Sequence, residues 1–148
     1  MAGAGLRSLT LFLDANVLID LLNGRRPHVR NRYEQAQRSK AVLAVSTLVA
    51  QEVLYGAEIS RRRELQRGNA EDLIGTLRIC DFDLDDARAC GALRAQMKRE
   101  GSPIGALDGL IAAQALRRGW TVITGNRREF ERVAGLTVID WTQPPESA

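Results

Sequence analysis

Short runs of consecutive apolar residues alternate along the chain with longer stretches in which apolar residues recur every three or four positions. The short runs are typical of buried strands. They lie at residues 9–13, 41–45, 77–82, 120–124 and 136–139. Because strands alternating with helical stretches are typical of βαβ units, the pattern predicts an α/β fold, a parallel sheet between layers of helices.

Capping residues mark the ends of the predicted helices in the first half of the chain. Asp14 is a preferred N-cap and Gly24 suits a helix C-terminus, which predicts a helix over about residues 14–23. Pro27 opens a second helix, residues 28–39. A third helix, which carries Glu52, follows Ser46 and Thr47.

The second half of the chain has the same alternation. Residues 61–77 predict two arginine-rich helical stretches with a break at Gly68–Asn69. A helix capped by Asp83 or Asp85 runs to about Glu100. The last two helices are predicted in the stretch around residues 108–119 and over residues 127–133, with a polar tail after residue 141.

Three carboxylates, those of Asp14, Glu52 and Asp108, stand where a core-facing apolar residue is expected. Asp14 ends the apolar run 11–13, Glu52 lies in an apolar stripe, and Asp108 is followed by apolar residues at helical spacing. A lone carboxylate removed from water is costly unless a positive charge neutralises it. Three of them in one small domain therefore suggest a shared cation.

The predicted elements place these carboxylates at one edge of the sheet. Asp14 directly follows a strand, Asn126 follows another by two residues, and Glu52 and Asp108 lie in the first turns of helices. Ligands of parallel sheets collect at the carboxyl ends of the strands, near the point where the strand order reverses. We therefore expect all four side chains to face the same edge.

Each of these residues also has a purely structural interpretation. Asp14 could serve only as an N-cap, which stabilises a helix by roughly 1 kcal/mol. Glu52 could pack its stem while its carboxylate reaches water, and Asn16 could be surface filler or could orient a neighbouring carboxylate. Asp108 interrupts the most apolar helix, residues 107–116, and is the hardest to explain structurally. A single shared cation explains the positions of all three acids better than three unrelated structural roles do.

The ligand types favour a hard cation, Mg²⁺ or Mn²⁺, because all the candidate donors are oxygens. The single histidine, His28, lies in a charged helix and is expected at the surface, which argues against histidine-based catalysis. No phosphate-binding loop, dinucleotide fingerprint or nucleophile elbow is present. An acidic magnesium site beside abundant arginine fits metal-assisted phosphodiester hydrolysis.

Composition is that of an ordinary globular domain, with 45% hydrophobic and 26% charged residues in 148. No apolar stretch approaches the ~20 residues of a membrane span, and no signal peptide is visible, which favours the cytoplasm. Cys80 and Cys90 lack metal-ligand spacing and are expected to be buried free thiols. The segment 1–8 is expected to be a flexible leader and 142–148 a polar tail around a domain spanning 9–141.

The net charge is +3, and nearly all of the basic residues are arginines: the chain has 19 arginines and only two lysines, Lys40 and Lys98. Arginine suits bidentate contacts to phosphate, although an arginine-rich surface is an equally good explanation. Arg127 and Arg128 follow Asn126 and are the expected phosphate contacts, whereas residues 61–63 are expected at the surface or against a protein partner.

Four segments of the chain together resemble the PIN-domain ribonucleases, and within them the VapC toxins of bacterial toxin–antitoxin modules. They are residues 13–19 (LDANVLI), 46–58 with QEVLYGAE at its end, 104–113 (IGALDGLIAA) and 124–133 (TGNRREFERV). Each is weakly specific alone, but the four occur in order at fitting intervals. The resemblance extends from Leu11 to Trp141.

The resemblance implies a parallel five-stranded sheet with helices on both faces, a three-layer α/β/α fold. It maps the family's core acids onto Asp14, Glu52 and Asp108, with Asp14 and Asp108 as metal ligands and Glu52 assisting directly or through water. Many PIN domains have a fourth acid where this chain has Asn126. Glu129 is a partial substitute one turn later. Thr124 and Ser46 would position the acids, a water molecule or phosphate by hydrogen bonds.

The function that the resemblance implies is a Mg²⁺-dependent endoribonuclease, the toxin of a type II module. The active form would be a homodimer, inhibited by a cognate VapB-type antitoxin in a heterotetramer or larger complex. Operator DNA would be bound only through the antitoxin.

Two other functions fit parts of the pattern. A phosphoaspartyl domain would also place an aspartate after its first strand, but it needs a lysine after a late strand, and neither Lys40 nor Lys98 lies there. A degenerate PIN module that binds RNA or a protein without cutting would explain Asn126. Metal-dependent cleavage of RNA separates that alternative from a nuclease.

Overall fold

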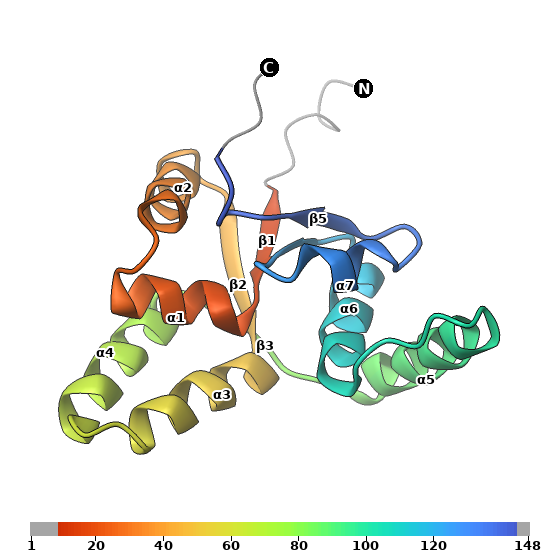
Figure 1. Ribbon diagram of the computed structural model, residues 1–148, viewed down its shortest axis with the longest axis horizontal. Coiled ribbons are helices and arrows are strands. Elements are labelled where there is room, and N and C mark those ends of the chain that lie inside the picture. Colours follow the sequence, from red (N-terminus) through yellow and green to blue (C-terminus); the bar gives the residue numbers. More distant parts are fainter. Residues whose placement is uncertain (1–8, 145–148) are drawn as a thin grey trace.

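Five parallel strands form the central sheet of the computed structural model, which describes residues 9–144 (Figure 1). They are β1 (Thr10–Leu13), β2 (Val42–Ser46), β3 (Arg78–Cys80), β4 (Thr121–Ile123) and β5 (Thr137–Ile139). Their order across the sheet is β3-β2-β1-β4-β5. The predicted α/β fold with a five-stranded parallel sheet is thus confirmed.

Seven helices flank the sheet in the described part of the chain, with α1 to α4 on one side and α5 to α7 on the other (Figure 1). They are α1 (Ala15–Asn23), α2 (Pro27–Arg38), α3 (Thr47–Glu58), α4 (Arg63–Gly75), α5 (Leu84–Arg99), α6 (Ala106–Arg118) and α7 (Arg127–Glu131). Asp14 caps α1, whose C-cap Gly24 has a φ of 65°, and Ser46 caps α3. These confirm the sequence-based helix boundaries to within a few residues.

The predicted break at Gly68–Asn69 is wrong, because α4 continues through both residues. Gly68 lies on the exposed face of the helix, where an added side chain would meet nothing within 4 Å. The next residue but one, Ala70, is fully buried in the core. Glycine costs a helix interior about 1 kcal/mol relative to alanine, and packing of the opposite face outweighs that cost.

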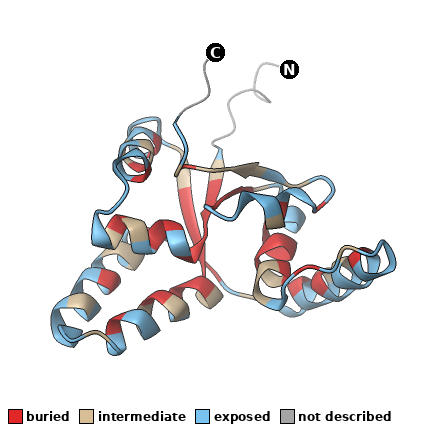
Figure 2. Cartoon of the chain, in the orientation of Figure 1, coloured by how far each residue is buried: buried red, intermediate tan, exposed pale blue. Residues whose placement is uncertain are grey.

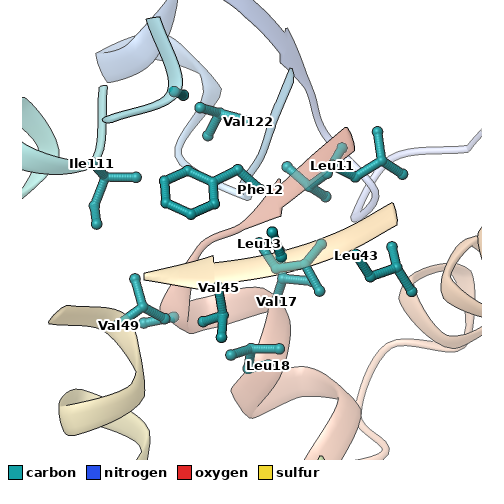
Figure 3. Packing of buried hydrophobic residues seen from close by; sticks show 14 of the residues in the cluster. Leu11, Phe12, Leu13, Val17, Leu18, Leu43, Val45, Val49, Ile111 and Val122 are labelled. Carbon is teal, nitrogen blue, oxygen red and sulfur yellow. The ribbon is translucent and has the colours of Figure 1, made fainter. Parts of the chain in front are cut away.

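The hydrophobic core lies on both faces of the three interior strands, β2, β1 and β4 (Figures 2 and 3). β1 and β2 are almost wholly buried, as their continuous apolar runs predict. Figure 3 shows Phe12 between Ile111 of α6 and Val122 of β4, while Val17 and Leu18 of α1 pack near Val45. The edge strands β3 and β5 lie outside this core, since most of their residues are partly or fully exposed.

The strand order reverses between β1 and β4. The chain passes from β1 outward to β2 and β3, then crosses back to place β4 on the other side of β1. The backbone N–H of Asp14 donates to the carbonyl of Ile123 over 2.9 Å, which joins the carboxyl ends of these strands. This is the position at which open parallel sheets bind ligands.

The cysteines and the histidine lie where the sequence predicts. Cys80 and Cys90 are buried free thiols, and His28 is exposed near the start of α2. No helix within residues 9–144 has the length and apolar character that a membrane crossing requires. The expected leader, 1–8, and the end of the expected tail, 145–148, lie outside the described residues.

Candidate active site

Asp14 is held rigidly at the start of α1. Its side chain is only 7% exposed, and both oxygens are engaged. Oδ1 accepts a hydrogen bond of 2.8 Å from the backbone N–H of Ala15, and Oδ2 accepts one of 2.7 Å from the hydroxyl of Thr124. Each oxygen keeps a further lone pair, so the carboxylate can cap the helix and still act as a ligand. The N-cap and the functional interpretation are therefore compatible.

A chain of hydrogen bonds connects Asp14 to Asp108. The hydroxyl of Thr124 donates to Asp14 and accepts from the backbone N–H of Asn126 over 2.9 Å. The side-chain amide of Asn126 donates to Oδ2 of Asp108 over 3.3 Å. The segment that follows β4 thus contacts both acids, and the predicted positioning role of Thr124 is confirmed.

Asp108 lies in the first turn of α6 and is half-buried. Burial is the largest cause that raises the pKa of this carboxyl from 3.8 to about 6. Three neighbouring carboxylates raise it further, those of Asp14, Glu129 and Glu52. The structure therefore brings the other three acids within electrostatic range of Asp108.

Glu52 is half-buried on α3, and the apolar stripe predicted around it faces the core at Leu48 and Val49 but turns to solvent after Glu52. Tyr55 and Ile59, which share its face, are 63% and 67% exposed. The core-facing residues of α3 are Val49, Ala50, Val53 and Ala57. A short apolar stripe does not by itself show which face of a helix packs against the core. In α3 the face that carries Val53 and Ala57 packs against it, and Tyr55 and Ile59 are left in solvent.

Glu129 connects α7 to the loop that precedes α6. Its Oε1 accepts from the backbone N–H of Gly105 over 3.0 Å, and Arg132 pairs with it over 2.8 Å. The Gly105 bond is the largest cause that lowers the pKa of Glu129, and Arg132 also lowers it. A β-carbon on Gly105 would lie 3.7 Å from oxygens of both Asp108 and Glu129. Glu129 is thus an ionised neighbour of Asp108 that fixes the start of α6.

Two residues suggested as positioning groups act elsewhere. The side-chain oxygen of Asn16 accepts from the backbone N–H of Gly125 over 3.3 Å, so it anchors the segment after β4 and orients no carboxylate. The hydroxyl of Ser46 caps α3 by accepting from Leu48 N–H over 3.1 Å, and within residues 9–144 it forms no hydrogen bond to Asp14 or Asp108. Both act through backbone groups around the site.

The donors at the site fit a hard divalent cation in their chemistry. All are oxygens, and no arginine or lysine is among the groups that shift the pKa of Asp108. A cation would relieve the mutual repulsion that raises this pKa. Within residues 9–144, however, no three His, Cys, Asp or Glu side chains already have the spacing of a metal-ligand set. Mg²⁺ usually keeps several water ligands and needs only one or two carboxylates, so Asp14 and Asp108 would be enough to hold it without a third acid in direct contact.

A second buried acid, Asp86, is a structural group that sequence reasoning missed. Its carboxylate is fully buried and bonds Arg117 over 2.6 Å and Arg118 over 2.7 Å. Burial acts to raise its pKa, but the bonds from Arg118, the Asp83 backbone and Arg117 hold that pKa well below its usual range. The spacing Asp83-x-x-Asp86 of the capping box was the available signal.

The arginines expected to bind RNA are exposed. Arg127 pairs with Glu131 one helical turn later, and Arg128 is exposed on the same short helix. Arg117 and Arg118, another pair of consecutive arginines, bind the buried Asp86 and hold α5 against α6. Their guanidinium groups therefore serve the packing of these two helices.

Comparison with known proteins identifies similar chains over most of the length. The PIN domain family model matches residues 11–136. A protein of Salmonella typhimurium named tRNA(fMet)-specific endonuclease VapC is 35% identical over 133 residues, which are 90% of this chain and 98% of that protein. A Haemophilus influenzae protein named ribonuclease VapC2 is 32% identical, again over 90% of this chain and 98% of its own length.

Solved structures with a similar fold also cover about 90% of this chain. The chain in the crystal structure of DNA-bound VapBC from Salmonella typhimurium has a TM-score of 0.80 at 34% identity, covering 90% of this chain and 98% of that one. VapBC2 from Rickettsia felis, bound to a DNA fragment from its promoter, has a TM-score of 0.82 at 27% identity, covering 90% and 99%.

Proposed function

This chain belongs to the PIN-domain family, and within it to the VapC proteins, and from that premise we propose that it is a Mg²⁺-dependent endoribonuclease, the toxin of a VapBC module. The observation that carries the proposal is the hydrogen-bonded connection of Asp14, Thr124, Asn126 and Asp108 at the point where the strand order reverses. Such a network around a cluster of acids serves no evident packing purpose.

The proposed metal ligands are Asp14 and Asp108, with Glu52 assisting directly or through water. When bound, Mg²⁺ or Mn²⁺ would activate water for attack and neutralise charge on the scissile phosphate. Thr124 holds Asp14 in one orientation, because its hydroxyl proton is directed at Oδ2. Asn126 donates to Asp108 and so orients that carboxylate, which makes Asn126 a positioning residue in this proposal.

The substrate proposed from the relatives is RNA. Two VapC relatives at 34–35% identity are named for specificity toward tRNA(fMet), which makes this tRNA the first substrate to test. The partner proposed is a VapB-type antitoxin, because the similar structures at 27–34% identity are VapBC complexes, two of them with DNA. A homodimer within a heterotetramer or larger assembly is the expected form, with operator DNA bound through the antitoxin.

The phosphoaspartyl alternative has less support from the structure. Lys40 lies in the turn after α2 and Lys98 near the end of α5, and neither is among the groups that shift the pKa of Asp108.

The test is cleavage of purified tRNA(fMet) by the purified chain with Mg²⁺, Mn²⁺ or EDTA. We expect defined fragments with either metal, none with EDTA, and none from Asp14→Asn. Arg38→Gln, an exposed change on α2, is the matched control and should cut like the wild type. Cleavage that persists in EDTA, or in Asp14→Asn, would contradict the assignment. Binding of RNA without cleavage at any metal concentration would favour the degenerate module.

A further inference from the structure

One exposed stripe of α3 leads away from the acidic site. Glu52, Tyr55 and Ile59 lie three and four residues apart, which places them on one face of the helix. Glu52 is half-buried near the acids, whereas Tyr55 and Ile59 are 63% and 67% exposed. At 1.5 Å per residue, the stripe from Glu52 to Ile59 is about 10 Å long. An aromatic residue this exposed, beside an active site, indicates a binding surface.

Three consecutive arginines, Arg61 to Arg63, begin two residues after Ile59 at the turn into α4. All three are exposed, and none forms an ion pair with another residue in the range 9–144. Their neighbour Arg67, by contrast, pairs with Glu58. The turn between α3 and α4 therefore has three positive charges without an ion pair in the described residues, beside the single exposed carboxylate of Glu64.

This charge and the exposed aromatic ring match the two chemical parts of a nucleotide chain. Base–aromatic stacking tolerates any base, because every base has a π-face, and arginine forks bind phosphate oxygens bidentately. The acidic cluster by itself repels a polyanion, so positive charge beside it is needed to hold RNA. The exposed Tyr55 and Ile59 alone would suit a protein partner as well, but three neighbouring arginines against one acid favour a polyanion.

We propose that α3 and the turn that follows it form an RNA-binding track, in which Tyr55 stacks on an unpaired base next to the scissile phosphate and Arg61–Arg63 bind the phosphates beyond it. The inference rests on the proposed ribonuclease function and extends it to substrate positioning. Arg127 and Arg128 stay as expected contacts on the other side of the site.

The test uses the full chain with Asp14→Asn, which removes cleavage, and fluorescein-labelled tRNA(fMet) as the probe. Binding is measured by fluorescence anisotropy across a series of salt concentrations. Replacing Arg61, Arg62 and Arg63 together by Gln should weaken binding and flatten the slope of log affinity against log salt by about 2, at roughly 0.7 for each phosphate that the protein no longer neutralises. Tyr55→Ala should weaken binding about tenfold and leave the slope unchanged, because stacking releases no counterions.

Two controls show whether the effects depend on where the arginines lie and on the aromatic ring of Tyr55, and not only on the loss of charge or of the tyrosine hydroxyl. Replacing Arg25, Arg38 and Arg99 together by Gln removes the same charge from three other exposed sites, and it should leave the slope nearly unchanged. Tyr55→Phe keeps the ring and should bind like the parent. In the cleaving protein, the track variants should raise KM for tRNA(fMet) and leave kcat within about twofold, since the acids are untouched.

The outcomes distinguish this inference from the proposed function. The wild type could cut RNA while the arginine variant of the track and the control triple have equal slopes of log affinity against log salt. That result would overturn the RNA-binding track and leave the proposed nuclease function in place. If the track variants bind RNA normally but lose self-association in sedimentation, the stripe is a protein interface and the inference is equally overturned. If the wild type neither cuts nor binds tRNA(fMet) or total cellular RNA, the proposed function itself fails.

Discussion

The hydroxyl of Thr124 donates to Oδ2 of Asp14 over 2.7 Å, although the two residues are 110 positions apart in the chain. The contact exists because β1 and β4 are neighbours in the sheet and end at the same edge. The same hydroxyl accepts from the backbone of Asn126, whose side chain reaches Asp108. One small buried side chain therefore sets the orientation of two acids from different parts of the sequence.

We predict that Thr124→Val reduces cleavage of tRNA(fMet) by about tenfold or more and destabilises the fold by about 1–3 kcal/mol. Valine has the shape of threonine, but it leaves the backbone N–H of Asn126 without its acceptor and Oδ2 of Asp14 without its donor. Urea unfolding and single-turnover cleavage are the measurements. Thr124→Ser keeps the hydroxyl and should retain most of the activity. Equal losses in Thr124→Ser and Thr124→Val would show that the methyl group matters and the hydrogen bond does not.

We predict that Asp108→Asn abolishes cleavage yet stabilises the metal-free protein at pH 8. The pKa of Asp108 is raised from 3.8 to about 6, so the folded state disfavours the ionised carboxylate. The resulting penalty is absent below about pH 4, grows as the pH rises to about 6, and is complete above that. A two-unit shift corresponds to about 3 kcal/mol at most, and partial exposure of the carboxylate reduces the expected gain to about 1 kcal/mol.

Thermal unfolding in EDTA at pH 4 and pH 8 measures this effect. At pH 8 the melting temperature of Asp108→Asn should be higher than that of the wild type. At pH 4 the two melting temperatures should be equal. Added Mg²⁺ should raise the melting temperature of the wild type and have less effect on the variant, since one ligand is gone. A variant that melts lower than the wild type at pH 8 in EDTA would mean that the carboxylate is stabilised by contacts other than the metal.

We predict that Asn126→Ala lowers activity less than Asp108→Ala, measured at saturating Mg²⁺. The amide of Asn126 donates to Asp108 over 3.3 Å, a long bond, and its neutral oxygen is a weak ligand for a hard cation. We expect a loss of about tenfold for Asn126→Ala, against loss of detectable cleavage for Asp108→Ala. Equal losses from both substitutions would show that Asn126 contacts the metal or the reacting phosphate.

We predict that Asp86→Ala destabilises the protein by about 3–5 kcal/mol, because Arg117 and Arg118 lose the buried carboxylate between them. The pKa of Asp86 is held low, so its contribution is present above about pH 4 and declines as the pH falls below that. The unfolding free energies of wild type and variant, measured at several pH values, should therefore converge in acid. Arg88→Ala, which breaks only the exposed pair with Asp85, is the control and should cost under about 1 kcal/mol.

The sequence alone determined the local structure and the identity of the acids. Continuous apolar runs predicted β1 and β2, and Asp14, Ser46 and Gly24 marked helix ends, because capping depends on residues within a few positions of each other. The four family-like segments identified Asp14, Glu52, Asp108 and Asn126, and the structure places all four near the carboxyl edge of the sheet.

Only the tertiary structure decided features that depend on distant packing. The burial of Ala70 keeps α4 continuous through Gly68, and the choice of which face of α3 meets the core turns Tyr55 outward. The Glu129–Gly105 bond spans 24 residues and the Arg118–Asp86 bond 32, so no local pattern specifies either of them. Periodicity and capping are short-range properties of a chain, whereas these contacts arise from the order β3-β2-β1-β4-β5 and from the helices packed around it.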